Sequence, residues 1–66
     1  MEIELNGAAH QVDEELSLSA LVSALGLSNQ AIAVAVNRQI IARSLWQMHM
    51  LQTQDKVDVV RAIGGG

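Results

Sequence analysis

Cysteine is absent from this chain of 66 residues, and so are phenylalanine and tyrosine. Without cysteine no disulfide can form, and nothing favours an oxidising compartment. Two isolated histidines, His10 and His49, are too few for a structural zinc site. A domain of this size buries only about 60% of the surface that its unfolded chain exposes, so stability must come from apolar content. Since half of the residues are hydrophobic, the sequence predicts one small domain held together by packing alone.

Long hydrophobic runs and an excess of positive charge are also missing. No segment approaches the roughly 18 uninterrupted apolar residues that cross a bilayer, and none has the layout of a cleavable leader. A net charge of −3 disfavours both anionic lipid surfaces and nucleic acid. We therefore expect a cytoplasmic protein whose partners are other proteins, with no role for a membrane or for nucleic acid.

The usual signatures of an enzyme are absent too. The chain has no Gly-Lys-Ser/Thr phosphate loop, and its only glycine cluster ends the chain instead of opening a helix, so we expect no bound triphosphate. Glu2 and Glu4 are expected to point to solvent from an edge-like strand, which leaves no carboxylate pair for acid and base chemistry. No serine stands in a nucleophile motif, and a joint metal site of His10 and His49 is not expected.

The first part of the chain predicts a hairpin followed by a helix. Residues 1–5 alternate apolar and charged side chains, and Asn6-Gly7 is the strongest short hairpin signal. Three acidic residues then precede the helix, where the helix dipole favours carboxylates. Ser17 is suited to cap a helix over residues 18–25, whose leucines and valine recur at helical spacing. Gly26 can adopt the left-handed conformation that closes this helix.

The second part predicts further strands. In residues 31–36 the bulky side chains share one face and the alanines share the other. Residues 37–39 are typical of a turn and residues 40–41 of a short strand. Ser44 is expected to cap a brief helical turn that contains Trp46, which we expect to fill the core. The last strand is predicted over residues 56–63.

This order of elements predicts an α+β domain over residues 1–63, with a mixed sheet of four to five strands and one main helix packed on one face. A single helix cannot cover both faces of the sheet. The side chains expected beneath the helix are Ile3, Leu5, Ile32, Val34, Val36, Val57 and Val59.

The other face of the sheet is expected to stay open. Small apolar side chains alternate there with charged ones, and such a surface is typical of transient protein docking. Val60 and Ala62 are candidate docking residues on this face. Arg61, beside the tail, is a third candidate, and like Arg43 it could guide a phosphate or an acidic groove; an ordinary surface ion pair is the alternative for both. The open face is expected to hold Ala33, Ala35, Val60 and Ala62, with Glu2, Glu4 and Asp58 around them.

The chain ends in Gly64-Gly65-Gly66 directly after the last predicted strand. Glycine lacks a Cβ, so its backbone can enter clefts too narrow for any side chain. At about 3.3–3.6 Å per residue, the three glycines reach roughly 10 Å. We expect Gly64 and Gly65 to thread into a partner and the carboxylate of Gly66 to be the reactive group. A frayed, inert terminus is the plain alternative.

Short motifs recur in a characteristic order along the whole of this small chain, namely Ile3-x-Leu5-Asn6-Gly7, the helix with Leu18, Leu21 and Leu25-Gly26, Ala33-Val34-Ala35-Val36-Asn37, Arg43-x-x-Trp46, Asp55-Lys56-Val57-Asp58-Val59-Val60 and the terminal glycines. In its size and in the order of these motifs the whole chain resembles the ThiS family, the bacterial sulfur carriers of thiazole biosynthesis for thiamine. Two departures from the family pattern lie in turns, where many relatives have Gly-Asp in place of Gln54-Asp55 and Pro-Arg in place of Ala42-Arg43.

The resemblance implies a β-grasp, ubiquitin-like fold and a carrier rather than an enzyme. It implies that an adenylyltransferase related to ubiquitin-activating enzymes uses ATP and Mg to join the Gly66 carboxylate to AMP. A persulfide from a donor of the cysteine desulfurase type then displaces AMP, which leads to a thiocarboxylate. A thiazole synthase is the implied acceptor of the sulfur, and no cofactor is implied for the chain itself.

Other functions remain open at this point. The small subunit of molybdopterin synthase also carries sulfur on a terminal Gly-Gly, although such chains are usually longer and richer in phenylalanine. A ubiquitin-like modifier would pass the activated Gly66 to a lysine amine of a target. A plain interaction domain with an inert tail is the remaining alternative.

Overall fold

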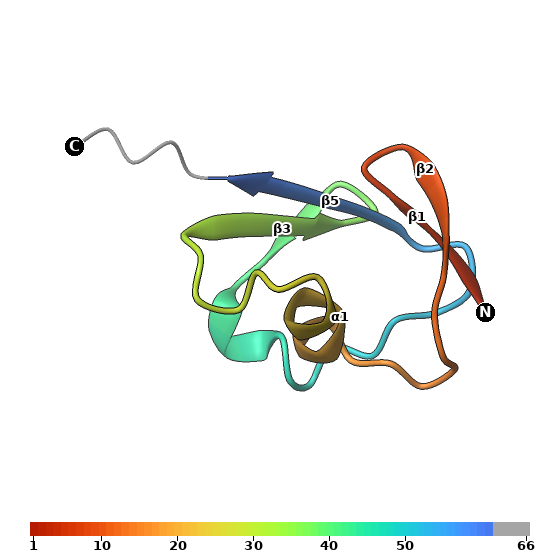
Figure 1. Ribbon diagram of the computed structural model, residues 1–66, viewed down its shortest axis with the longest axis horizontal. Coiled ribbons are helices and arrows are strands. Elements are labelled where there is room, and N and C mark those ends of the chain that lie inside the picture. The colour runs from red at the N-terminus through yellow and green to blue at the C-terminus, as the bar shows by residue number, and fades with distance from the viewer. Residues whose placement is uncertain (62–66) are drawn as a thin grey trace.

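The computed structural model describes residues 1–61 (Figure 1). The sheet in this part of the chain has five strands in the order β2-β1-β5-β3-β4. β1 and β5 run parallel, and the other neighbours are antiparallel. The elements in chain order are β1 (Glu2–Leu5), β2 (Ala8–Gln11), α1 (Leu18–Ala24), β3 (Ile32–Val36), β4 (Gln39–Ile41), a 3₁₀ helix (Arg43–Leu45) and β5 (Lys56–Arg61).

α1 lies across one face of the sheet (Figure 1). Its buried side chains form one core cluster with those of the sheet. The predicted core face is confirmed, since four of its side chains are buried and Leu5, Ile32 and Val59 pack against them. Trp46 is only 4% exposed, and its indole Nε1–H donates to the Ile41 carbonyl at 2.9 Å, so the predicted core role holds. The buried residues are Ile3, Leu18, Leu21, Val22, Val34, Val36, Trp46, Leu51 and Val57.

Both ends of α1 follow from local sequence. The Ser17 hydroxyl accepts a hydrogen bond from the Ala20 N–H at 3.0 Å, as a capping serine should. Gly26 has φ +73°, and the bonds Gly26 N–H to Ser23 O and Leu27 N–H to Val22 O form a Schellman motif. The helix ends at Ala24, one residue before the predicted end, with Leu25 as its C-cap. No helix in residues 1–61 is long and apolar enough to span a membrane.

Two turns of the same kind join the hairpins. Asn6-Gly7 links Leu5 to its register partner Ala8, with φ values of 50° and 84°, which confirms the predicted hairpin. Asn37-Arg38 links β3 to β4 with φ values of 51° and 69°. Two-residue turns with φ positive at both positions match the twist of antiparallel strands. The second turn is one residue shorter than predicted, because Gln39 already belongs to β4.

Two expectations are wrong. β1 was expected near an edge of the sheet, but it lies between β2 and β5 because the last strand pairs with it in parallel. Ser44 was expected to cap the short helical turn, but the 3₁₀ helix begins at Arg43, and its N-cap residue Ala42 makes no side-chain cap.

Candidate functional site

The central strand of the sheet is the one that leads to the C-terminus. β5 lies between β1 and β3, and its pairing with β3 continues to the partners Ile32 and Arg61. The predicted site residues Ala62, Gly64, Gly65 and Gly66 lie outside the described residues. The structure therefore defines the base from which the C-terminal segment departs.

Two asparagines hold β5 in place, one on each side. The Asn37 Oδ1 accepts a hydrogen bond from the Lys56 N–H at 3.0 Å, and its Nδ2 donates to the Asp55 carboxylate at 3.0 Å. On the other side, the Asn6 Oδ1 accepts from the Val59 N–H at 2.8 Å. Each asparagine is the first residue of a two-residue turn, so the turn that ends a neighbouring strand also adds a rung to β5.

The open face of the sheet carries an apolar patch that extends from the last residues of β5 across β3 to β4. Val60 is 62% exposed and lies opposite Ala33 in the register. Ile40 is 73% exposed and lies opposite Ala35. These four residues, Ala33, Ala35, Ile40 and Val60, form what we call the open-face patch.

The position of Ile40 on the open face was not predicted, because residues 40–41 are expected to form a short strand but neither side chain is assigned to a face of the sheet. The signal was present in the length of the preceding turn. A two-residue loop of Asn37 and Arg38 puts Gln39 opposite Val36 and so puts Ile40 opposite Ala35, on the open side.

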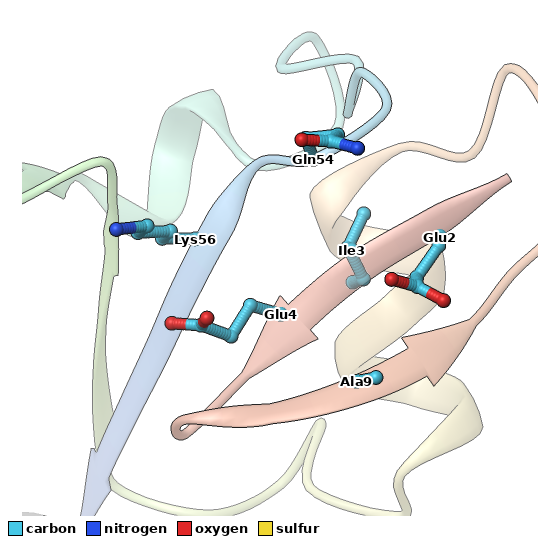
Figure 2. Close-up of a pocket in the computed structure, with 6 residues that line it drawn as sticks. All are labelled: Glu2, Ile3, Glu4, Ala9, Gln54 and Lys56. Atoms are coloured by element: carbon cyan, nitrogen blue, oxygen red, sulfur yellow. The ribbon is translucent and has the colours of Figure 1, made fainter.

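Charged side chains adjoin the open-face patch on the same face of the sheet. Asp58 lies opposite Ala35, and Glu4 lies opposite Lys56 on the neighbouring strand. Figure 2 shows Glu2, Glu4 and Lys56 around a shallow hollow over β1 and β5. The Glu2 carboxylate accepts from the Gln11 side-chain amide at 3.0 Å. A partner that covered the patch would meet mostly negative charge at this rim.

Arg61 lies on the other face. Its register partner is Ile32, and side chains at odd positions of β5 point toward the helix side, as the alternation predicted. Arg61 is exposed there and does not belong to the open-face patch. Arg61 and Val60 therefore flank the base of the C-terminal segment from opposite faces of the sheet.

Arg43, the other candidate arginine, has a structural role. Its guanidinium carbon lies 4.5 Å from the centre of the Trp46 ring, the geometry of a cation–π contact. The same group donates to the carbonyls of Ser28 and Gln30 at 3.2 and 2.8 Å. Arg43 thus ties the loop between α1 and β3 to the 3₁₀ helix, which gives a physical reason for the Arg43-x-x-Trp46 motif.

The histidines lie apart from each other. His10 lines a hollow beside Leu16, Leu21 and Ala24, while His49 lines another beside Val36. Over residues 1–61, no group of three or more His, Cys, Asp or Glu side chains is placed to hold a metal ion.

Residues 1–61 form a mixed sheet in which β1 and β5 are parallel neighbours and α1 crosses one face, and this arrangement defines a ubiquitin-like β-grasp domain. The model of the ThiS family matches residues 2–66. The chain belongs to the ThiS family.

Individual relatives agree with this assignment. The chain is 30% identical to the sulfur carrier protein ThiS of Escherichia coli over the full length of both. It is 35% identical to a thiazole synthase of Magnetococcus marinus, of which it spans only 20%. The crystal structure of the thiamine biosynthesis protein ThiS from Geobacter metallireducens matches the whole chain with a TM-score of 0.87 at 28% identity.

Proposed function

We propose that this ThiS-family sulfur carrier takes up sulfur at the carboxylate of Gly66 and donates it for thiazole formation in thiamine biosynthesis. The observation that carries the proposal is the match of the family model through residue 66, together with the full-length match to a sulfur carrier. The chain acts as a co-substrate with a tethered reactive group rather than as a catalyst.

The chemistry starts from the fact that a carboxylate is a poor acyl donor. One carboxylate oxygen of Gly66 attacks the α-phosphorus of ATP, pyrophosphate leaves, and a mixed anhydride with AMP forms. A persulfide sulfur then attacks the carbonyl carbon and AMP leaves, which gives an acyl disulfide. A thiol reductant cleaves the S–S bond, so the terminus keeps one sulfur as a thiocarboxylate.

Three partners are proposed from these steps. An adenylyltransferase related to ubiquitin-activating enzymes supplies the ATP and Mg site, and a donor of the cysteine desulfurase type supplies the persulfide. A thiazole synthase accepts the sulfur. Support for the last partner comes from the thiazole synthases of Magnetococcus marinus and Paramagnetospirillum magneticum, because each contains a segment similar to the whole of this chain.

The open-face patch and its rim are the proposed docking surface for the adenylating enzyme. Val60 lies one residue before the last described residue, so a protein that covers it is well placed to receive the C-terminal segment. Exposed apolar side chains next to acidic ones favour a partner surface that is apolar with basic groups at its edge. Ala62 is proposed to extend this contact, and Arg61 is proposed to contact the same partner from the opposite face of the sheet.

The absence of cysteine makes the function easy to test. The purified chain is incubated with the adenylating enzyme, ATP, Mg, a persulfide donor and a thiol reductant, and is then treated with a thiol-alkylating reagent. Since the chain has no thiol of its own, rapid alkylation marks a thiocarboxylate. We expect one alkyl group per wild-type chain and none on the chain that lacks Gly66. No labelling of the wild type, or equal labelling of the truncated chain, would contradict the proposal.

A further inference from the structure

β5 pairs with β3 along more of its length than with β1. On the β3 side the register runs from Val36 and Val57 to Ile32 and Arg61. On the β1 side it ends at Leu5 and Val57, because the chain then turns away at Asn6-Gly7. The last residues of β5 are therefore paired on one side only.

Backbone groups on the β1 side can be assigned from the bonds at the start of this edge. The Asn6 N–H donates to the Val57 carbonyl at 2.9 Å, and the Val59 N–H donates to the Asn6 side chain. Along a strand, the N–H and C=O of one residue point to one side and those of the next residue point to the other. The next groups on the β1 side are therefore the Val59 C=O and the Arg61 N–H. Among the described residues, no backbone group pairs with either of them.

No strand of the described residues continues beside this edge beyond Asn6. Gly7 follows Asn6 in the turn, and apart from Gly7 and its chain neighbours no heavy atom lies within 4 Å of the position that a Cβ on Gly7 would take. The Asn6 side chain closes the ladder at Val59, and from there outward no backbone group of the described residues pairs with this edge. An extended backbone strand from another protein could continue the ladder where Asn6 ends it.

We propose that the adenylating enzyme adds an extended segment of its own to this edge, pairing with the Val59 C=O and the Arg61 N–H. This inference rests on the proposed function and concerns how the partner grips the same site. Strand addition uses main-chain hydrogen bonds for affinity and leaves side chains free for specificity.

The short distance along the chain from this edge to Gly66 favours the adenylating enzyme as the protein that binds here. Gly66 lies five positions beyond Arg61, a reach of at most about 18 Å. A strand paired at Val59 and Arg61 would therefore stand at the entrance of the cleft that receives Gly66. The outer edges of β2 and β4 offer backbone groups as well, but they belong to the two outermost strands of the sheet. A strand added at either of them would be separated from β5 by β1 or β3.

A pair of substitutions at one position isolates the backbone donor. Arg61→Pro removes the N–H and the guanidinium, while Arg61→Ala removes only the guanidinium. The Arg61 N–H faces away from β3, and proline is tolerated in a strand where its missing donor faces solvent. Both variants should therefore melt within a few degrees of each other.

The expected result is a fall in kcat/KM for sulfur loading of about tenfold for Arg61→Pro relative to Arg61→Ala, since a rung is lost and the proline ring obstructs the added strand. In the wild-type chain, the Arg61 amide proton should exchange rapidly when free and slowly in the complex with the enzyme.

Other outcomes separate this inference from the proposed function. Equal kcat/KM for the two variants, with the wild type fully loaded, would overturn the strand addition and leave the carrier function standing. If Arg61→Pro altered the sedimentation mass of the free protein, the occupant would be a second copy of this chain, which also overturns the proposal. A wild-type chain that takes up no sulfur would remove the proposed function and this inference with it.

Discussion

The side-chain oxygen of Asn6 accepts a hydrogen bond from the backbone N–H of Val59 at 2.8 Å, across 53 positions of sequence. This bond joins the first turn of the chain to the strand that leads to its last residues. Asn6 has φ +50°, a conformation that asparagine tolerates better than most residues. One residue thus serves both the hairpin turn and the alignment of β5.

Asn6→Gly tests that bond without breaking the turn, because glycine accepts positive φ. We expect a loss of about 0.5–1.5 kcal/mol in the free energy of unfolding, since the Val59 N–H loses its protein acceptor. Urea denaturation of the variant and of Asn6→Asp, which keeps an acceptor oxygen, measures the difference. Glycine also relieves the strain of a left-handed residue, so a glycine variant more stable than the wild type by about 1 kcal/mol, the full value of that strain, would show that the bond contributes nothing to stability.

Gln54 offers a stabilising change. It has φ +68° in the turn before β5. A left-handed conformation costs a residue with a Cβ about 1 kcal/mol, so Gln54→Gly should raise the free energy of unfolding by up to that amount. Its backbone bond from N–H to the Glu2 carbonyl, 2.7 Å, is unaffected by the substitution.

Gly7→Ala makes the reverse change, because it adds a Cβ at a position with positive φ. Gly7 has φ +84° and open space around it, so an added Cβ would meet no neighbour and only the backbone conformation would be strained. We expect a lower melting temperature for Gly7→Ala and a higher one for Gln54→Gly. The reverse order would contradict the account of these turns.

Arg43→Lys separates positive charge from geometry. Lysine keeps the charge but cannot reach the Ser28 and Gln30 carbonyls with a planar fork while stacking on Trp46. We expect a loss of about 1 kcal/mol in unfolding free energy and unchanged kinetics of sulfur loading. The single tryptophan reports unfolding by fluorescence. A loading defect in a folded Arg43→Lys variant would instead assign Arg43 to a partner contact.

Val60→Glu and Ile40→Glu test the open-face patch. Both side chains are more than half exposed, so stability should change little, whereas a charge placed in an apolar contact should weaken docking on the adenylating enzyme about tenfold or more. Met48→Glu is the control, because Met48 is 77% exposed and lies outside the sheet. Calorimetry with the enzyme gives the Kd values. A large fall in melting temperature for Val60→Glu would place Val60 in the core and remove the patch.

Local patterns predicted most of the fold. Ser17, Gly26 and Asn6-Gly7 act through nearby atoms, so their roles could be inferred from spacing alone, and period-two alternation identified the core face. The interior position of β1 could not be inferred in this way. It depends on parallel pairing between Leu5 and Val57. These residues are far apart in sequence and are not joined by one short turn whose residues would indicate the pairing.

The candidate site was predictable to a smaller extent. The alternation of side chains placed Val60 and Arg61 on opposite faces. The face on which Ile40 lies could be predicted only from the length of the Asn37-Arg38 turn. The hydrogen bonds of Arg43 to the loop before β3 could be predicted only from the three-dimensional path of that loop. The role of Gly66 comes from resemblance to a family, since a carboxylate on glycine has no special reactivity until a partner activates it.

Tandem mass spectrometry of the chain isolated from cells that make thiamine shows whether sulfur is carried on the carboxyl group of Gly66. Exchange of one oxygen for sulfur adds almost the same mass as oxidation of a methionine, and the chain has three methionines, so fragmentation must locate the gain. We expect a gain confined to the C-terminal fragment that contains Gly66. A gain found only on fragments with Met1, Met48 or Met50, with an unmodified C-terminal fragment, would contradict it.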